Sequence, residues 1–390
     1  MSSWMRLTAL LAVGGTGLAV ISGAAGWGTA HRVLAAIALP PIAALVAAAW
    51  ISARRLLRPS VVALVLFGLA ALLTGRAVHL VFASLAFAAC VWTAAFTFRS
   101  SVAAGPWRDY VTLTKPRIMS LLLLTGAAGF FVGAGRVSSL GAFGLTMLGL
   151  ALACGGASAL NHYLDRDIDK LMGSRTERRP VASGRVPPAA AMEFGLALSA
   201  FSFVLLDALV NLPTALLALA GNLFYVVIYT RWLKRSTAQN IVIGGAAGAV
   251  PPLVGFAGAS GHFGWAAVFM FAIVFIWTPP HFWALALMIK EHYAKAGVPM
   301  LPVTRGDRET ARQILWYTVV LVAVTLAPVA LGTFGLVYGL SALALGAAFL
   351  WLAAQLRRTM TRPAAVRLFH FSLLYLALLF VAMAIDTVVM

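Results

Sequence analysis

Long hydrophobic runs follow one another along almost the whole chain, and short polar breaks separate them. A helix needs about 20 predominantly apolar residues to cross a bilayer, and spans are helical because hydrocarbon offers no partner for a free backbone polar group. Counting these runs predicts an all-α integral membrane protein with about 13 spans. The expected spans are residues 7–26, 33–53, 60–75, 78–98, 118–135, 140–160, 189–210, 213–230, 239–258, 264–288, 314–333, 336–355 and 369–388.

The amino-acid composition agrees with this pattern. Hydrophobic residues make up 62% of the 390 residues and charged residues only 10%, whereas soluble domains contain roughly 25% charged residues. A water-soluble globule is therefore excluded. The two cysteines, Cys90 and Cys154, lie inside apolar runs, without the spacing of a disulfide pair or a zinc site.

The net charge of +18, from 29 Lys and Arg against 11 Asp and Glu, has two interpretations. A basic chain can bind nucleic acid, but here the basic residues lie in short clusters between apolar runs, where the positive-inside rule places them. With a cytoplasmic N-terminus, alternate breaks collect 26 of the 29 basic residues inside, and only Arg32, Arg76 and Arg136 remain outside. We expect a multi-pass protein of the cell membrane that contacts lipid and no nucleic acid, with its C-terminus outside.

A long polar break at residues 99–117 divides the chain into two parts. The first four expected spans contain no acidic residue, and all 11 Asp and Glu lie from Asp109 onward. Chemistry that needs carboxylates must therefore belong to the second part. We expect a four-helix transmembrane module at residues 1–105 and a nine-helix domain at residues 106–390.

The most informative carboxylates follow the sixth expected span, in the stretch NHYLDRDID (161–169). Asn161, Asp165 and Asp169 recur at every fourth residue, so on a continuing helix they share one face. Oxygen ligands suit Mg²⁺, which bridges protein carboxylates to substrate phosphates. The spacing predicts a magnesium site at the cytoplasmic end of this helix.

Basic residues in two cytoplasmic breaks would complete a site for a diphosphate, because Arg and Lys bind phosphate oxygens through charge-assisted hydrogen bonds. The alternative is a solvated loop of mixed charge at the end of a span. Three carboxylates within five residues repel one another unless a cation binds them, which favours the site. Asp167, off the shared face, would pair with local basic residues. The candidate diphosphate ligands are Arg175, Arg179, Lys234 and Arg235.

Longer strings carry a family resemblance. NHYLDRDIDKLM with Arg175-Thr176 and Arg179-Pro180, YTRWLKRSTAQNIVIGGAAGAVPPLVG (229–255), WTPPHFWALA (277–286) and AGVPMLPV (296–303) resemble the UbiA-type membrane prenyltransferases, and among them the branch that farnesylates protohaem IX. The resemblance runs from about residue 110 to residue 390, over nine spans, which is the usual number in that family.

This resemblance implies an enzyme that forms haem O. Farnesyl diphosphate would be bound through Mg²⁺ on the cytoplasmic side, diphosphate would leave, and the allylic carbon would join a vinyl group of haem B. Asn161, Asp165 and Asp169 would be the catalytic metal ligands. A haem A synthase or an oxidase-assembly protein would be the partner that takes the product.

Two further stretches bear on the pocket. Many relatives in the wider superfamily carry a second D-x-x-x-D where this chain reads IKEHY (289–293), so a second fully acidic metal site is not expected, and Lys290 and Glu291 are candidate pocket residues. The pair Pro279-Pro280 is expected to break span ten, with His281 and Trp283 following as a pocket wall. His281 would either bind or orient the haem iron, or bond a backbone carbonyl as a packed histidine. Trp283 would line the pocket or anchor the span at the membrane interface.

Residues 1–98 lie outside this match. His31 and His79, in GTAHRVLA and RAVHLVFA, begin two parallel expected spans at similar depth, so the two imidazoles are candidate ligands of one haem. With these histidines the stretch resembles one four-helix half of haem A synthase. The alternative is a plain helical bundle with two interfacial histidines.

Two other functions remain open from the sequence. A UbiA-type enzyme acting on a quinone or chlorin precursor would use the same acidic motif, although the WTPPHFW and VPMLP strings argue against it. A haem carrier or transporter without chemistry would be marked by charges inside the membrane, and the sequence has none in the middle of an expected span.

Overall fold

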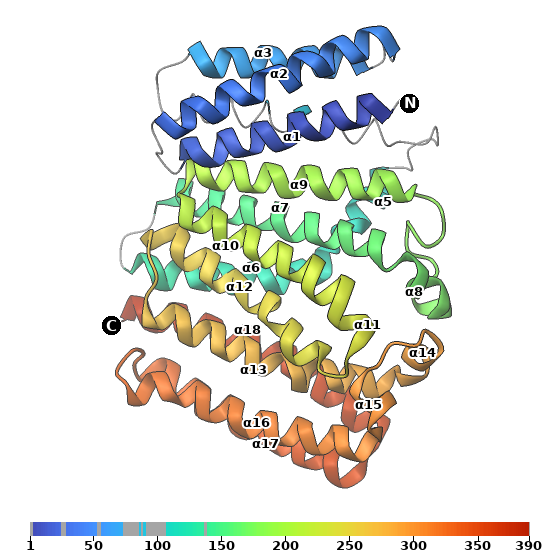
Figure 1. The fold of residues 1–390 in the computed structure, drawn as a ribbon. Helices are drawn as coiled ribbons and strands as arrows, with labels where there is room; N and C mark the ends of the chain where they lie inside the picture. The colour runs from blue at the N-terminus through green and yellow to red at the C-terminus, as the bar shows by residue number, and fades with distance from the viewer. Residues whose placement is uncertain are drawn as a thin grey trace.

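The computed structural model describes residues 3–24, 29–52, 56–72, 86, 89–90, 107–135 and 139–389. Within these ranges every regular element is a helix, as the hydrophobic pattern predicts. The long helices lie side by side with their axes nearly parallel, and the two chain ends lie at opposite ends of the helices (Figure 1).

Nine of the helices that are long and apolar enough to span a membrane follow residue 115, and each corresponds to one expected span. One of the nine changes character along its length: α10 (Leu212–Leu223) continues as a π-helical segment, η3 (Phe224–Leu233), and as α11 (Lys234–Ser236). The other eight are α6 (Pro116–Ala134), α7 (Leu140–Leu164), α9 (Pro188–Leu209), α12 (Asn240–Ser260), α13 (Trp265–Met288), α16 (Gly306–Ala330), α17 (Leu336–Thr359) and α18 (Arg362–Val389).

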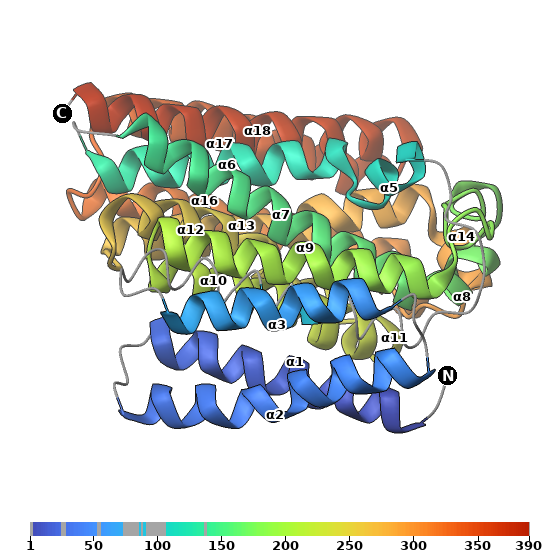
Figure 2. The ribbon, with the colours of Figure 1, turned by 90° about the horizontal axis from the view of Figure 1, so that it is seen from above.

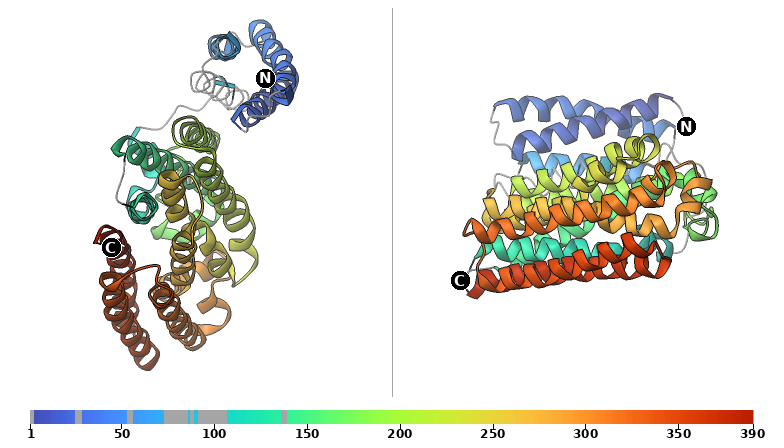
Figure 3. Two further views of the ribbon diagram at one scale, coloured as in Figure 1. Left: turned by 90° about the vertical axis from the view of Figure 1, so that its left-hand side faces the viewer. Right: turned by 90° about the horizontal axis from the view of Figure 1, so that it is seen from below.

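The first 105 residues contribute one further candidate span, in α2 (Thr29–Ser52). The apolar parts of α1 (Ser3–Ala24) and α3 (Leu57–Leu72) are shorter. The expected span 78–98 lies almost entirely outside the described residues, so the expected total of about 13 spans is not confirmed. The helices α1, α2 and α3 share an apolar cluster around Ile42 and Leu45. They lie next to the rest of the molecule beside α9 (Figures 1 and 3).

Short helices gather at one end of the long ones, which we call the site end (Figures 1 and 2). Two helices start earlier there than the hydrophobic runs predict, α16 at Gly306 and α18 at Arg362. Their charged first turns are helical although they lie outside the apolar stretch. The short helices of the site end are α5 (Trp107–Leu113), α8 (Arg166–Leu171), η2 (Gly173–Arg175), α14 (Lys290–Lys295) and α15 (Leu301–Thr304).

The expected break at Pro279-Pro280 is wrong, because α13 continues through both prolines to Met288. Each proline removes one backbone hydrogen bond. The helix nevertheless packs against α12, α16 and α18, and neighbouring helices support such positions in membrane proteins. The prolines therefore leave His281 on a continuous helix.

Candidate active site

The junction between α7 and α8 positions the three predicted metal ligands. Asn161 lies in the last turn of α7, Asp165 at the junction and Asp169 in α8. The backbone N–H of Asp165 donates to the Asn161 carbonyl and that of Asp169 to the Asp165 carbonyl, each at 2.8 Å. The helical spacing therefore survives the junction. All three side chains are buried, and the Asn161 amide donates to Asp165 Oδ2 at 2.8 Å.

Three cationic side chains from three separate segments of the chain contact this trio. Lys234 Nζ lies 2.5 Å from Asp165 Oδ2, and Arg179 Nη1 lies 2.7 Å from Asp169 Oδ1. Lys115 Nζ donates to Asn161 Oδ1 at 2.7 Å. The result is a buried charge cluster at the site end of the helices.

Two carboxylate oxygens in this cluster, Asp165 Oδ1 and Asp169 Oδ2, are buried without a hydrogen-bond partner among the described residues. Leaving a buried charged acceptor without a partner costs folding free energy. Carboxylate oxygens are the ligands that hard divalent cations prefer. The residues present therefore fit Mg²⁺. Within the described ranges no group of three or more His, Cys, Asp or Glu side chains gathers as a metal site, so the Asn161 amide and substrate oxygens would have to complete the coordination.

Burial changes the pKa values of two groups in this cluster. Burial raises the pKa of the Asp169 carboxyl above its usual value, although the Arg179 guanidinium opposes the change. Burial, reinforced by Arg179, lowers the pKa of the Lys115 ammonium to about 7, while Asp165 opposes the change. A bound cation would bring the first pKa down and a bound diphosphate would bring the second up, because opposite charges favour the ionised form.

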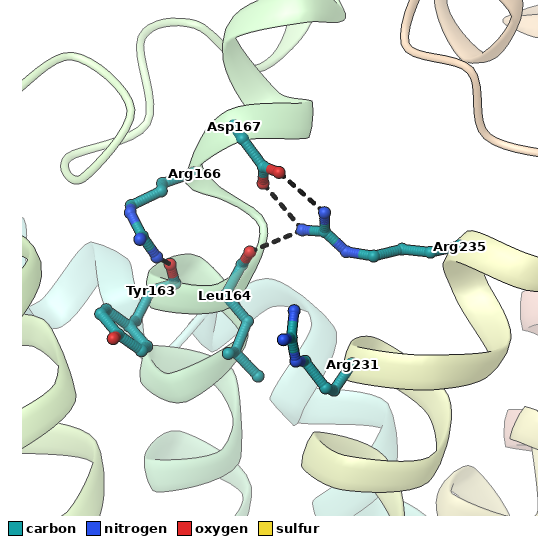
Figure 4. Close-up of a pocket in the computed structure, with 6 residues that line it drawn as sticks. All are labelled: Tyr163, Leu164, Arg166, Asp167, Arg231 and Arg235. Carbon is teal, nitrogen blue, oxygen red and sulfur yellow. Dashed lines mark hydrogen bonds and ion pairs between the residues drawn. The ribbon is translucent and has the colours of Figure 1, made fainter.

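Lys234 and Arg235 are adjacent in the sequence, but their side chains contact different carboxylates. Lys234 is buried against Asp165, whereas Arg235 donates two 2.7 Å hydrogen bonds to Asp167 and a third to the Leu164 carbonyl (Figure 4). The Arg235 bonds hold the pKa of Asp167 far below its usual range. Asp167 thus pairs with a local basic residue, as its position off the shared face predicts.

His281, on α13, lies between two aromatic rings, with ring centroids 4.3 Å from Trp277 and 4.8 Å from Phe369 of α18. Its Nδ1 lies 2.7 Å from the Ser372 hydroxyl oxygen. That hydroxyl donates its proton to the Phe369 carbonyl at 2.6 Å, so Nδ1 must carry the proton that it donates to Ser372. In the neutral imidazole this hydrogen bond places the lone pair on Nε2.

A family model described as the UbiA prenyltransferase family matches residues 122–382. The chain belongs to this family. It is 53% identical over 281 residues to a protoheme IX farnesyltransferase of Symbiobacterium thermophilum. This alignment covers 72% of this chain and 94% of that protein. It is 55% identical over 285 residues to a protein of the same name from Gloeobacter violaceus, and that alignment covers 72% of this chain and 92% of that protein.

The fold is also that of solved family members. A UbiA homolog from Archaeoglobus fulgidus, solved bound to GPP and Mg²⁺, matches with a TM-score of 0.55 at 18% identity, covering 72% of this chain and all of that one. The matched family region contains the α7–α8 junction and every residue of the acidic trio.

Two residues of this UbiA-type site escaped the sequence analysis. Lys115 joins α5 to α6 with φ 50° and ψ 61°, a left-handed conformation that is unusual for Lys and costs backbone strain. Its signal was a lysine directly before Pro116 at the start of a span. Thr230, whose hydroxyl oxygen accepts from the Asn161 amide at 3.1 Å, gave no signal, because its position depends on the π-helical turns of η3.

The other predicted site residues make contacts away from the acidic cluster. The Trp283 ring packs against Tyr317 of α16, on another side of α13 from His281. Lys290 pairs with Asp307 at 2.5 Å, and Glu291 is exposed. Both Lys290 and Glu291 line a separate cavity of about 450 Å³ at the starts of α14 and α18. The Arg175 side chain lies outside the described residues.

The two candidate haem ligands of the first module lie outside the matched family region. His31 Nδ1 lies 3.0 Å from the Ala19 carbonyl oxygen, which ties α2 to α1. His79 lies outside the described residues, so the pairing of the two histidines around one haem stays a prediction.

Proposed function

We propose that this chain transfers the farnesyl group of farnesyl diphosphate to a vinyl group of haem B, giving haem O for terminal oxidase biogenesis. One observation carries the proposal. The partnerless oxygens of Asp165 and Asp169 lie inside a ring of three cations. The chain that builds this cluster shares more than half of its aligned residues with proteins named protoheme IX farnesyltransferase.

The chemistry on the donor side is loss of diphosphate. The bond between C1 of the farnesyl group and the diphosphate oxygen breaks, and the electron pair leaves with the diphosphate. Lys115, Lys234 and Arg179 are placed to hold the charge that develops there, which preorganised cations do without reorganisation at the moment of reaction. Mg²⁺ held by Asn161, Asp165 and Asp169 would add further charge stabilisation.

The chemistry on the acceptor side is addition to an alkene. The vinyl electrons of haem B form the new carbon–carbon bond to C1, the adjacent carbon takes the oxygen of a water molecule, and that water releases one proton. Apolar helices around the cluster would hold the farnesyl tail and keep other water away from the reacting carbon. Both substrates are amphiphiles that a membrane-embedded site can take up from the bilayer.

We assign His281 to the haem side of the reaction. A neutral imidazole with its lone pair on Nε2 is the form that ligates iron, and the Ser372 hydrogen bond holds this form. His281→Ala is expected to weaken haem B binding by at least tenfold and to remove the spectral signature of a histidine-ligated iron. Ser372→Ala should weaken it by about tenfold, since supporting partners of a ligand are worth 10- to 100-fold. The measurement is a titration of the purified protein with haem B.

The matched control is His262→Ala, because His262 is exposed in the turn between α12 and α13 and should leave the haem spectrum unchanged. Ser372→Thr keeps a hydroxyl and should restore most of the affinity. An unchanged iron spectrum in His281→Ala would remove His281 from the haem side.

The protein is a multi-pass membrane protein, and we propose the cell membrane with the acidic cluster on the cytoplasmic side. The excess of Lys and Arg in the breaks at the site end supports this orientation. We also propose residues 106–390 as the prenyltransferase domain and residues 1–105 as an appended helical module. Support comes from the family match, which begins at residue 122, and from the separate apolar cluster of α1, α2 and α3.

The function is tested by supplying both substrate classes. Membranes containing the chain are expected to convert haem B and farnesyl diphosphate into a haem whose mass is increased by one farnesyl group and one hydroxyl group. Chelation of divalent cations should stop the reaction, and added Mg²⁺ should restore it. Transfer to 4-hydroxybenzoate instead of haem B would favour the quinone-precursor alternative. Haem binding without any transfer would favour a carrier.

A further inference from the structure

A second charged site lies at the α7–α8 junction, beside the acidic cluster. It is a cavity of about 350 Å³ between the end of α7 and the last turns of η3 (Figure 4). The metal-ligand candidates do not line it. Its lining consists of Tyr163, Leu164, Arg166, Asp167, Arg231 and Arg235.

Two of its three arginines have an ordinary structural role at the end of α7. Arg166 donates to the Tyr163 carbonyl at 2.6 Å and stacks over the Tyr163 ring at 4.7 Å. Arg235 donates to the Leu164 carbonyl and to Asp167. Cations that bond the last carbonyls of a helix stabilise its C-terminus. These contacts hold the two guanidinium groups in place at the cavity wall.

Arg231 has no such role. It lies one helical turn before Arg235 and points toward the same helix end (Figure 4), yet no ion pair or hydrogen bond connects it to any residue that the structure describes. The lining therefore carries three positive charges against one negative charge, from Asp167. A cavity with this surplus and one free guanidinium favours an anionic ligand.

The surroundings indicate where that anion comes from. Leu223 and Val227 precede Arg231 at intervals of four residues and are half-exposed, and Trp232 is 61% exposed. This apolar strip belongs to a candidate membrane span that ends at residue 236. It therefore faces lipid, with Arg231 at its polar end and an exposed Trp of the type enriched at membrane interfaces.

We propose that this cavity binds the phosphate of an anionic phospholipid, with Arg231 as the residue that holds it and the acyl chains along Leu223 and Val227. Basic pockets between membrane helices on the cytoplasmic side bind lipid headgroups in this way. The hydrogen bonds and ion pairs of this cavity do not reach the Asp165 or Asp169 side chains, so we expect lipid binding there to be separable from farnesyl transfer.

The experiment uses the full chain, purified in a mild detergent and stripped of lipid. Short-chain phosphatidylglycerol, short-chain phosphatidylcholine and inorganic diphosphate are titrated separately, with the thermal unfolding midpoint and native mass spectra as readouts. Phosphatidylglycerol is expected to raise the midpoint and to remain bound more than phosphatidylcholine. Arg231→Gln should weaken phosphatidylglycerol binding by about tenfold, as expected for loss of a charge-assisted hydrogen bond.

The matched control is Arg358→Gln, because Arg358 is also exposed and lies in the last turn of α17. This variant should bind phosphatidylglycerol like the unchanged chain. Arg231→Gln should unfold at the unchanged midpoint without lipid, since Arg231 supports no contact. The proposal is overturned if Arg231→Gln keeps its affinity for phosphatidylglycerol, or if inorganic diphosphate or farnesyl diphosphate displaces the lipid at equal concentration.

Discussion

Asp165→Asn is expected to reduce haem O formation by a factor of about 10²–10³, the loss typical of removing one preorganised electrostatic contact to a transition state. Asp165 supplies one of the two buried oxygens without a partner and also holds Lys234 in the cluster. An amide in its place removes the charge that a divalent cation needs. The measurement is the initial rate of haem O formation at a series of Mg²⁺ concentrations, where the variant should require far more Mg²⁺.

Asp167→Asn is the matched control, because Asp167 lies two residues away in the same segment. Its side chain is largely exposed and bonds Arg235 instead of the cluster. We expect its rate to stay within a few-fold of the unchanged chain. Equal activity of Asp165→Asn and Asp167→Asn would show that the helical face of Asn161, Asp165 and Asp169 does not carry the reaction.

Stability has to be separated from catalysis in this test. Removing one partner of a buried ion pair leaves the other charge uncompensated, which costs about 3–5 kcal/mol. Lys234 is buried, so the Asp165→Asn protein should unfold at a lower temperature. A double variant, Asp165→Asn with Lys234→Met, removes both charges. It should regain stability and remain inactive, whereas regained activity would mean that the single variant had failed only through misfolding.

The parts of the site that could be predicted are those that one helix contains. Asn161, Asp165 and Asp169 share a face because an α-helix repeats every 3.6 residues, and the sequence shows that spacing directly. The nine spans from residue 118 onward were equally visible, since each is set by its own run of apolar residues. Such features depend on local geometry alone.

The parts that could not be predicted depend on contacts between distant segments. Lys115 and Thr230 both reach Asn161, from positions 46 residues before and 69 residues after it. Neither lies in a recognisable pattern around the acidic motif. Lys234 and Arg235, in contrast, are adjacent on α11, and adjacent residues on a helix point about 100° apart, so their different partners follow from local geometry.

The directions of His281 and Trp283 follow from helix geometry. Two residues apart on a helix, their side chains point about 160° apart, so one short helix segment cannot direct both into one pocket wall. In the structure His281 contacts α18 and Trp283 contacts α16. A proline-broken span would have allowed both, and α13 is not broken.

Gly255→Ala is expected to lower stability by about 3 kcal/mol or more, above the usual range for overpacking of a core. Gly255 lies in α12 against α6, where an added Cβ would come within 1.8 Å of the Gly126 carbonyl oxygen and 2.8 Å of the Phe130 backbone nitrogen. Small residues let membrane helices approach to backbone contact. Because both neighbours are backbone atoms of a packed helix, neither can move aside as a flexible side chain would.

The same helix supplies the control for this prediction. Gly248 also lies in α12, and an added Cβ there would meet nothing within 4 Å. Gly248→Ala should therefore be neutral or stabilising by up to about 1 kcal/mol, because Ala is the better helix former. The measurement is the thermal unfolding midpoint and the yield of monodisperse protein for both variants. If both glycine variants unfold alike, α6 and α12 do not pack through Gly126 and Gly255.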